Sequence, residues 1–151
     1  MPEYLPQASS FNELLQECFR LNRSIVEAAI ELTAGAGVTG TQWGVLSALG
    51  QGAQPRTVAE TARRMGLARQ SVQRVADVLA DSGLVRYLPS PEDRRTKRVD
   101  VTDAGRALLA KLDARQRDWV AEIVGDGTER DIKKALLLIK KIRKRIIQQA
   151  V

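Results

Sequence analysis

The segment Ser90–Leu109, SPEDRRTKRVDVTDAGRALL, contains the features that decide the fold. Its opening Ser-Pro pair suits the first positions of a tight turn. Charged residues crowd positions 92–95, and residues 98–101 then alternate between charged and apolar side chains, as a half-buried strand does. Residues 85–88 form another β-prone run just upstream. Together these features predict a two-stranded hairpin with a charged tip.

Two helices are predicted directly before this hairpin. Thr57 and Glu60 have the spacing of a capping box, which opens a short helix that Gly66 ends. A second helix is expected over residues 69–82. Two helices separated by a tight turn that contains glycine are typical of a helix-turn-helix. With the hairpin after it, the segment is predicted to be a winged helix.

The second of these helices has two faces of different chemistry. Its apolar side chains repeat at helical spacing and can pack onto a core: Val72, Val75, Ala76 and Leu79. Its polar side chains gather toward the start of the helix, with Ser71 near the boundary: Arg69, Gln70, Gln73 and Arg74. Long polar side chains at this end of such a helix can meet base edges and phosphates.

Charge is distributed unevenly along the 151 residues, which carry a formal net charge of +6. Residues 55–101 hold ten basic and six acidic side chains, and nine of the ten bases are arginine. Residues 131–151 hold seven basic and one acidic side chain, mostly lysine. Arginine suits forked contacts with phosphate and guanine, whereas lysine is a solvated point charge. The middle of the chain is therefore the predicted recognition surface for a polyanion.

Composition excludes several classes of site. The chain has one cysteine and no histidine, so a disulfide within the chain and catalysis by a histidine base are impossible, and a Cys/His zinc site is excluded in practice. No phosphate-binding glycine loop and no paired-carboxylate setting is present. We expect no enzyme activity, no cofactor and no metal. The first residues lack a signal-peptide pattern and no apolar run approaches ~20 residues, so a cytoplasmic protein without membrane contact is expected.

Three more helices are predicted outside the winged helix. Ser10 and Glu13 have the form of a capping box for a first helix that begins near Phe11. Thr102 and Thr128 are expected to cap two helices at the other end of the chain. Their apolar stripes are larger than a small winged helix can cover, so we expect them to be buried in a dimer.

The segments LARQSVQRVADVLADSGLV and SPEDRRTKRVDVTDAG resemble the MarR family of bacterial transcriptional regulators. Matching positions of the wing pattern are Pro91, Asp93, Arg94, Arg95, Val99, Val101, Thr102 and Gly105. TQWGVLSAL, Thr41–Leu49, is similar to the second helix of that family. Two positions depart from the pattern, Ser90 in place of the usual aspartate and Val101 in place of leucine. Neither replacement changes the predicted fold.

The resemblance implies a mainly α, winged helix-turn-helix fold of the α+β type. It also implies a dimerisation helix over residues 1–37, a DNA-binding region over 38–101, and dimerisation helices over 102–151. Such a homodimer binds a pseudo-palindromic operator in double-stranded DNA, and we expect a repressor relieved by an effector or by oxidation. The residues implied to read or clamp the major groove are Arg69, Gln70, Ser71, Gln73 and Arg74. Arg94 or Arg95 would enter the minor groove, with Asp93 holding a neighbouring arginine.

Other interpretations stay open at this point. A winged-helix dimer could act through protein–protein contact, and Cys18 could be a redox sensor, although its place on an apolar stripe favours inert packing. Trp43, Trp119 and Phe19 could line a pocket for a small aromatic effector, or could be core. The basic run at residues 140–145 is interrupted by an isoleucine at core spacing, which favours a solvated face over a second DNA site.

Overall fold

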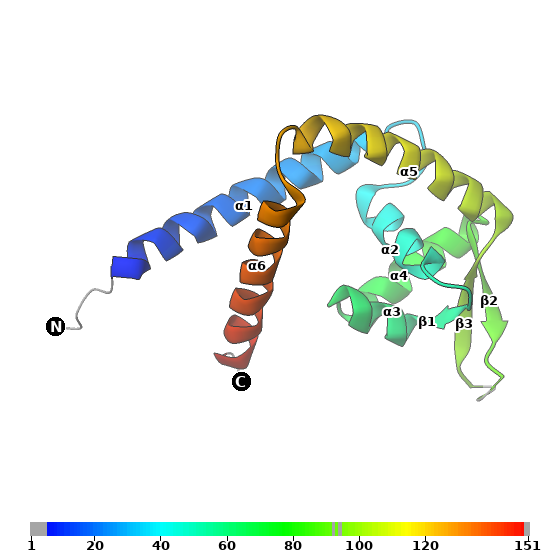
Figure 1. Cartoon of the computed structure of the whole chain (residues 1–151). Coiled ribbons are helices and arrows are strands. Elements are labelled where there is room, and N and C mark those ends of the chain that lie inside the picture. Colours follow the sequence, from blue (N-terminus) through cyan, green and yellow to red (C-terminus); the bar gives the residue numbers. More distant parts are fainter. Residues whose placement is uncertain (1–5, 92, 94, 150–151) are drawn as a thin grey trace. The chain divides into compact units, whose positions relative to one another are not determined.

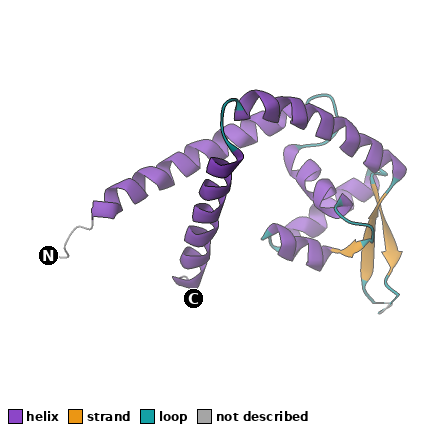
Figure 2. Cartoon of the chain, viewed as in Figure 1, coloured by secondary structure: helices purple, strands orange, loops and turns teal. Residues whose placement is uncertain are grey.

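The computed structural model describes residues 6–91, 93 and 95–149, and it divides into two compact units, residues 1–115 and 116–151. Over the described residues there are six helices and one three-stranded sheet (Figures 1 and 2). The elements, in chain order, are α1 Pro6–Leu32, α2 Gly40–Gly50, β1 Arg56–Thr57, α3 Val58–Met65, α4 Arg69–Asp81, β2 Val85–Pro89, β3 Lys97–Val101, α5 Asp103–Val124 and α6 Glu129–Gln149. The mainly α winged-helix prediction is confirmed.

The helix-turn-helix consists of α3 and α4. Thr57 caps α3 through a capping box, with its side chain accepting from the backbone N–H of Glu60 and the Glu60 side chain accepting from the backbone N–H of Thr57. Gly66 ends α3 in the left-handed conformation at φ 66°, which glycine adopts without steric cost. Both predictions for this motif are confirmed. The tight turn places the first residues of α4 on the surface, where all of residues 69–71 are exposed.

The wing is the antiparallel hairpin of β2 and β3, in which Val85 pairs with Val101 and Tyr87 pairs with Val99. Val99 and Val101 are buried, as their alternation predicts. The sheet has a third strand that the sequence did not predict, since β1 pairs with β3 to give the order β1-β3-β2. β1 is only two residues long, too short to show a periodic pattern. It ties the start of α3 to the wing.

One aliphatic core holds the helix-turn-helix to the sheet. Three side chains of α4 lie in it, Val72, Ala76 and Leu79, each no more than 1% exposed. α2 contributes Leu46 and its neighbours, and the sheet contributes the valines of β2 and β3. Because these side chains all lie on the inner face of α4, its polar residues are left on the outer face. The core therefore fixes which side chains α4 presents to a partner.

The start of α1 differs from its prediction. The helix begins at Pro6, so Ser10 lies inside it and does not cap it. Proline is well suited to the first helical turn, because its ring fixes φ near the helical value and it lacks only an N–H that would have no partner there. At the other end, Arg115 of α5 donates to the carbonyl oxygens of Leu32 and Ala34 at 2.8 and 3.0 Å. Cys18 on α1 is partly exposed.

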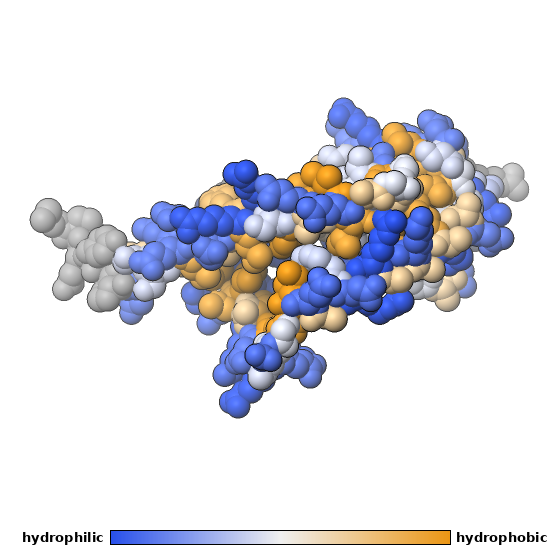
Figure 3. Space-filling model, turned by 90° about the horizontal axis from the view of Figure 1, so that it is seen from above, coloured by the Kyte–Doolittle hydropathy of each residue, from blue (hydrophilic) through white to orange (hydrophobic). Residues whose placement is uncertain are grey.

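Residues 116–151 form the second unit, which contains the end of α5 and all of α6. Thr128 caps α6 by accepting from the backbone N–H of Asp131 at 3.2 Å, as predicted. None of the residues of α6 is buried, and seven of its large apolar side chains are between 43 and 67% exposed. The face drawn in Figure 3 shows apolar (orange) surface open to solvent among hydrophilic (blue) side chains. None of the described helices combines the length and apolar character that crossing a bilayer requires.

Candidate nucleic-acid interface

The polar face of α4 carries all five of the residues predicted to meet the major groove. Four of them are exposed: Arg69, Gln70, Ser71 and Arg74. Gln73 is half-buried because its side chain turns toward the wing. Ala68 precedes the helix and provides no side-chain cap, so the first turn of α4 has free backbone N–H groups. An uncapped N-terminus carries a partial positive charge, which favours an anion nearby.

The tip of the wing is shaped by Asp93. Its carboxylate accepts from the backbone N–H of Arg95 at 2.9 Å and from the Thr96 hydroxyl at 3.1 Å. The backbone N–H of Thr96 donates to the carbonyl oxygen of Asp93 at 3.0 Å, which closes the turn. Asp93 thus holds the backbone from which the Arg95 side chain extends, exposed to solvent. Arg94, the other candidate for the minor groove, lies outside the described residues.

A hollow of about 410 Å³ lies between α4 and the wing, and we call it the helix–wing hollow. The start of α3, the outer side of α4 and both wing strands line it. Three cations face it, Arg69, Arg95 and Lys97, against one carboxylate, that of Asp77. The fold therefore brings Arg69 and Gln73 together with Arg95, although they are more than 20 positions apart in the sequence. Gln70, Ser71 and Arg74 lie on the neighbouring surface of α4.

A hydrogen-bonded network joins α4 to the wing at the floor of this hollow. The Tyr87 hydroxyl donates to Oδ1 of Asp77 at 2.6 Å. Nε2 of Gln73 donates to the same Oδ1 at 2.9 Å and to the Tyr87 hydroxyl oxygen at 2.8 Å. Nζ of Lys97 lies 5.8 Å from the centre of the Tyr87 ring, within reach of a cation–π contact. The network fixes the side chain of Gln73 against the wing.

The network also shifts two pKa values. Burial, followed by the hydrogen bond to Asp77, raises the pKa of Tyr87 to about 12. The hydrogen bonds from Tyr87 and Gln73 lower the pKa of Asp77 below its ordinary value. At neutral pH the tyrosine is therefore protonated and donates, and the aspartate is ionised and accepts.

Sequence reasoning missed Tyr87, Asp77 and Lys97 as parts of this surface. Gln73 and Asp77 are four residues apart, a spacing that places two side chains on the same helical face. That signal was present, but the tyrosine that joins them comes from β2. Its position depends on how the wing packs on α4, which the linear pattern does not show.

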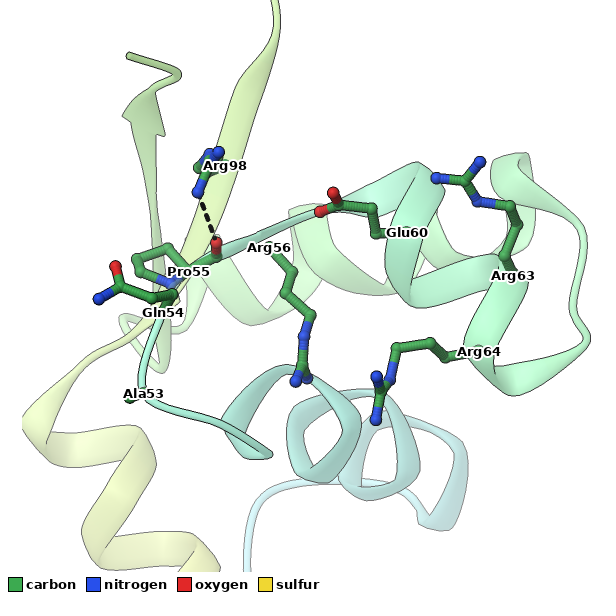
Figure 4. Close-up of a pocket in the computed structure, with 8 residues that line it drawn as sticks. All are labelled: Ala53, Gln54, Pro55, Arg56, Glu60, Arg63, Arg64 and Arg98. Carbon is green, nitrogen blue, oxygen red and sulfur yellow. Dashed lines mark hydrogen bonds between the residues drawn. The ribbon is translucent and has the colours of Figure 1, made fainter. Parts of the chain in front are cut away.

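A second basic hollow of about 480 Å³ lies between α3, β1 and the strand β3, and we call it the arginine hollow. Figure 4 shows the four arginines and the one carboxylate, that of Glu60, that line this hollow. The arginines are Arg56, Arg63, Arg64 and Arg98. Arg56 donates to the carbonyl oxygen of Ala48 at 2.9 Å, and Arg98 donates to that of Pro55 at 3.4 Å. The excess of cations adds to the positive field around the helix-turn-helix.

Comparisons with known proteins agree with this geometry. Residues 36–96 match the sequence profile of the MarR family. The HTH-type transcriptional regulator PapX of Escherichia coli is 27% identical over 111 residues, which are 73% of this chain and 68% of that protein.

Solved structures share the fold. The transcriptional regulator BldR from Sulfolobus solfataricus superposes with a TM-score of 0.78 at 22% identity, over 93% of this chain and 99% of that one. The M. tuberculosis regulator MOSR, solved in complex with DNA, gives a TM-score of 0.72 at 26% identity, over 87% of this chain and 96% of that one. The wing pattern, the helix-turn-helix with its polar outer face and these likenesses lead to one conclusion. Residues 36–96 match the MarR family, and the chain is similar in sequence and fold to winged helix-turn-helix transcriptional regulators.

Proposed function

We propose that the chain is a repressor that binds a pseudo-palindromic operator in double-stranded DNA as a homodimer and is released by an effector. The observation that carries the proposal is the helix–wing hollow, where an uncapped helix start and three cations surround a half-buried amide. A surface of this kind suits a phosphate backbone on its rim and base edges at its centre. The DNA complex of MOSR supports the same use of the fold.

In this proposal α4 lies in the major groove. Arg69 and Arg74 contact phosphates or guanine, and Gln70, Ser71 and Gln73 contact base edges. The wing reaches the adjacent minor groove with Arg95 or with Arg94. Narrow A·T tracts concentrate negative potential there, which attracts an arginine. Asp93 supports the inserted arginine by fixing the turn backbone, as its bonds to Arg95 and Thr96 suggest.

The homodimer is supported by apolar surface that a single chain leaves open. On α1, Phe19 is 76% exposed and Ile30 is 64% exposed. On α6, Leu137 is 67% exposed and Ile147 is 59% exposed. Burying such side chains lowers the free energy by roughly 25 cal/mol for each Å² of apolar surface removed from water. A second copy of the chain would cover the same faces by symmetry, because a two-fold interface uses one patch twice.

Release by a small aromatic effector, or by oxidation of Cys18, stays a prediction. Of the aromatic residues considered for an effector pocket, Trp43 is 8% exposed in unit 1, and its indole N–H meets no acceptor among the described residues. Phe19 is exposed on α1, and Trp119 is partly exposed. Trp43 is thus the residue of the three to probe first.

The test is selection from a library of random duplexes, followed by titration of the enriched duplex by fluorescence anisotropy. We expect a two-fold motif with half-sites ~10 bp apart and an affinity that falls steeply as salt rises. A protein that enriches no motif, and that binds every duplex with the affinity of random DNA, would contradict the proposal.

A further inference from the structure

We propose that Arg56 and Arg64 form a binding site for a small, multiply charged anion in the arginine hollow, beside the end of α2. The ligand class is a small molecule that carries two or more negative charges on carboxylate or phosphate groups. The inference goes beyond the proposed function, because it concerns a ligand other than DNA and a surface other than the helix–wing hollow.

The arginine hollow has an excess of positive charge that its own residues do not neutralise. Four arginines line it together with one carboxylate, that of Glu60. This carboxylate already accepts from the backbone N–H of Thr57 at 2.8 Å, in the capping box of α3. Among the described residues, neither Arg56 nor Arg64 forms an ion pair. Because like charges that share a hollow repel one another, an anion bound between them is attracted to both.

Arg56 is held in place before any ligand binds. Its Nη1 donates to the carbonyl oxygen of Ala48, near the end of α2, at 2.9 Å. Its Nη2 lies so close to the Gly52 backbone that a Cβ at Gly52 would be only 2.6 Å from it. The other N–H donors of Arg56 make no hydrogen bond to a described residue. A half-buried guanidinium fixed in this way loses little conformational freedom when it binds a ligand.

Arg64 reaches the same place from α3. Figure 4 shows the side chains of Arg56 and Arg64 directed toward α2, whereas those of Glu60 and Arg63 extend in a different direction. A further hollow of about 420 Å³, which we call the α2–α3 hollow, is lined by Gly44, Ser47, Ala48, Gln51, Arg64 and Met65. Ala48 accepts from Arg56 and also lines this hollow with Arg64. Both guanidinium groups therefore lie beside the end of α2.

The chemistry of the two hollows suits a small molecule with several charged oxygens. Guanidinium groups bind carboxylate and phosphate oxygens through forked pairs of hydrogen bonds. The Ser47 hydroxyl and the Gln51 amide of the α2–α3 hollow can donate to further oxygens. The volumes, about 480 and 420 Å³, are of the size that small-molecule sites have. The site thus fits a di- or tricarboxylate or a small phosphate compound.

The DNA backbone is a less suitable occupant, because α3 separates this site from the proposed DNA surface. Residues 57–59, at the start of α3, line the helix–wing hollow, whereas Glu60, Arg63 and Arg64 line the arginine hollow. Of the described residues that line the arginine hollow, none belongs to α4. A duplex that has α4 in its major groove would meet the helix–wing surface first.

The experiment is calorimetric titration of the full-length protein with citrate, pyrophosphate and acetate, at one fixed ionic strength. We expect the wild type to bind citrate or pyrophosphate at one site per chain, and the tighter of the two identifies the preferred group. Acetate, with a single charge, should bind more weakly than either. Arg64→Gln should weaken binding by about tenfold or more, since it removes a charge-assisted, forked contact.

Arg117→Gln is the matched control, because it removes an exposed arginine from α5 and changes the net charge by the same amount. Its anion affinity should equal that of the wild type. Arg64 is exposed and makes no hydrogen bond to another described residue, so Arg64→Gln should be as stable as the wild type in urea. If it is not, Arg64→Lys keeps the charge but loses the fork, and should bind the anion less tightly than the wild type.

Three results would overturn the inference. One is a wild type that binds neither citrate nor pyrophosphate at millimolar concentration. Another is an equal loss of anion affinity in Arg64→Gln and Arg117→Gln, which would reflect net charge alone. The third is a loss of operator affinity in Arg64→Gln as large as that in Arg74→Ala, which would assign the hollow to the DNA backbone. Failure to enrich any duplex contradicts only the proposed function, because the anion titration contains no DNA.

Discussion

The Tyr87 hydroxyl of β2 lies 2.6 Å from Oδ1 of Asp77 on α4, so the wing and the helix beside it are joined by a direct hydrogen bond. Both groups belong to unit 1, and the bond crosses from the sheet to the helix-turn-helix. The contact has consequences for stability as well as for recognition, because it keeps the Tyr87 hydroxyl protonated.

The first prediction concerns high pH. The pKa of Tyr87 rises from 10.0 to about 12 on folding, so the folded chain holds this proton more tightly than the unfolded chain. The resulting stability is fully present below pH 10 and is lost as the pH rises through about 12. In urea unfolding at pH 8 to 12, the wild type should lose its advantage over Tyr87→Phe across this window. A constant difference between the two proteins would contradict the account.

The second prediction separates the two basic regions. Arg74→Ala should weaken operator binding at least tenfold, because it removes a cation from the exposed face of α4. Lys141→Ala removes a cation from α6, where the basic side chains form a solvated face, and should change the affinity by less than twofold. Anisotropy titrations at one fixed salt concentration compare them. Equal losses of DNA affinity would show that the lysine-rich helix α6 contributes to binding as much as the arginine-rich helix α4 does.

The third prediction concerns a glycine that the wing pattern contains. A Cβ at Gly105 would clash with the Leu84 carbonyl oxygen, which belongs to the backbone and cannot move aside without shifting the chain. Gly105→Ala should therefore lower the free energy of unfolding by about 2 kcal/mol or more.

Gly44→Ala is the matched control. It also lies inside a helix, but its Cβ would meet only the end of the Met65 side chain, at 3.9 Å. Alanine is the better helix former, so this variant should be more stable than the wild type by about 0.5–1 kcal/mol. Urea denaturation measures both. Similar effects of the two substitutions would show that the contact with Leu84 is not what requires glycine.

The fourth prediction addresses the proposed dimer. Ile139 on α6 is 43% exposed in the single chain, and Ile139→Glu would place a charge in the proposed apolar interface. We expect sedimentation equilibrium to show a dissociation constant at least a hundredfold weaker, since burying an unpaired carboxylate costs several kcal/mol. Lys140→Glu is the control, because that residue is exposed on the same helix and already charged. A dimer that both variants leave intact would place the interface elsewhere.

Local signals explain what could be predicted from the sequence. Both ends of α3 are set by interactions within a few residues, so the sequence pattern alone predicts them. The capping box of Thr57 and Glu60 begins the helix, and Gly66 ends it. The alternation that ends in Val99 and Val101 predicted the wing for the same reason. The helix start predicted from the capping-box pattern of Ser10 and Glu13 is wrong, because such a pattern competes with other possible helix starts. Pro6 provides an earlier one, and Ser9 instead lies near Glu13 within the helix, at 3.5 Å.

What could not be predicted depends on tertiary packing. β1 consists of two residues whose partners lie more than 40 positions away on β3. The link of Gln73 and Asp77 to Tyr87 requires the wing to pack over α4 in one register. The sequence pattern identifies the polar side chains of α4. It does not show which of them form hydrogen bonds with the wing, because those partners come from β2.

Sequence-specific binding by the helix–wing surface is tested by a protection footprint of the purified protein on the DNA that flanks its own gene. We expect a protected, two-fold symmetric segment with half-sites ~10 bp apart, and protection that weakens as salt rises. Absence of any protected segment, at low ionic strength as well as high, would contradict sequence-specific binding by the helix–wing surface.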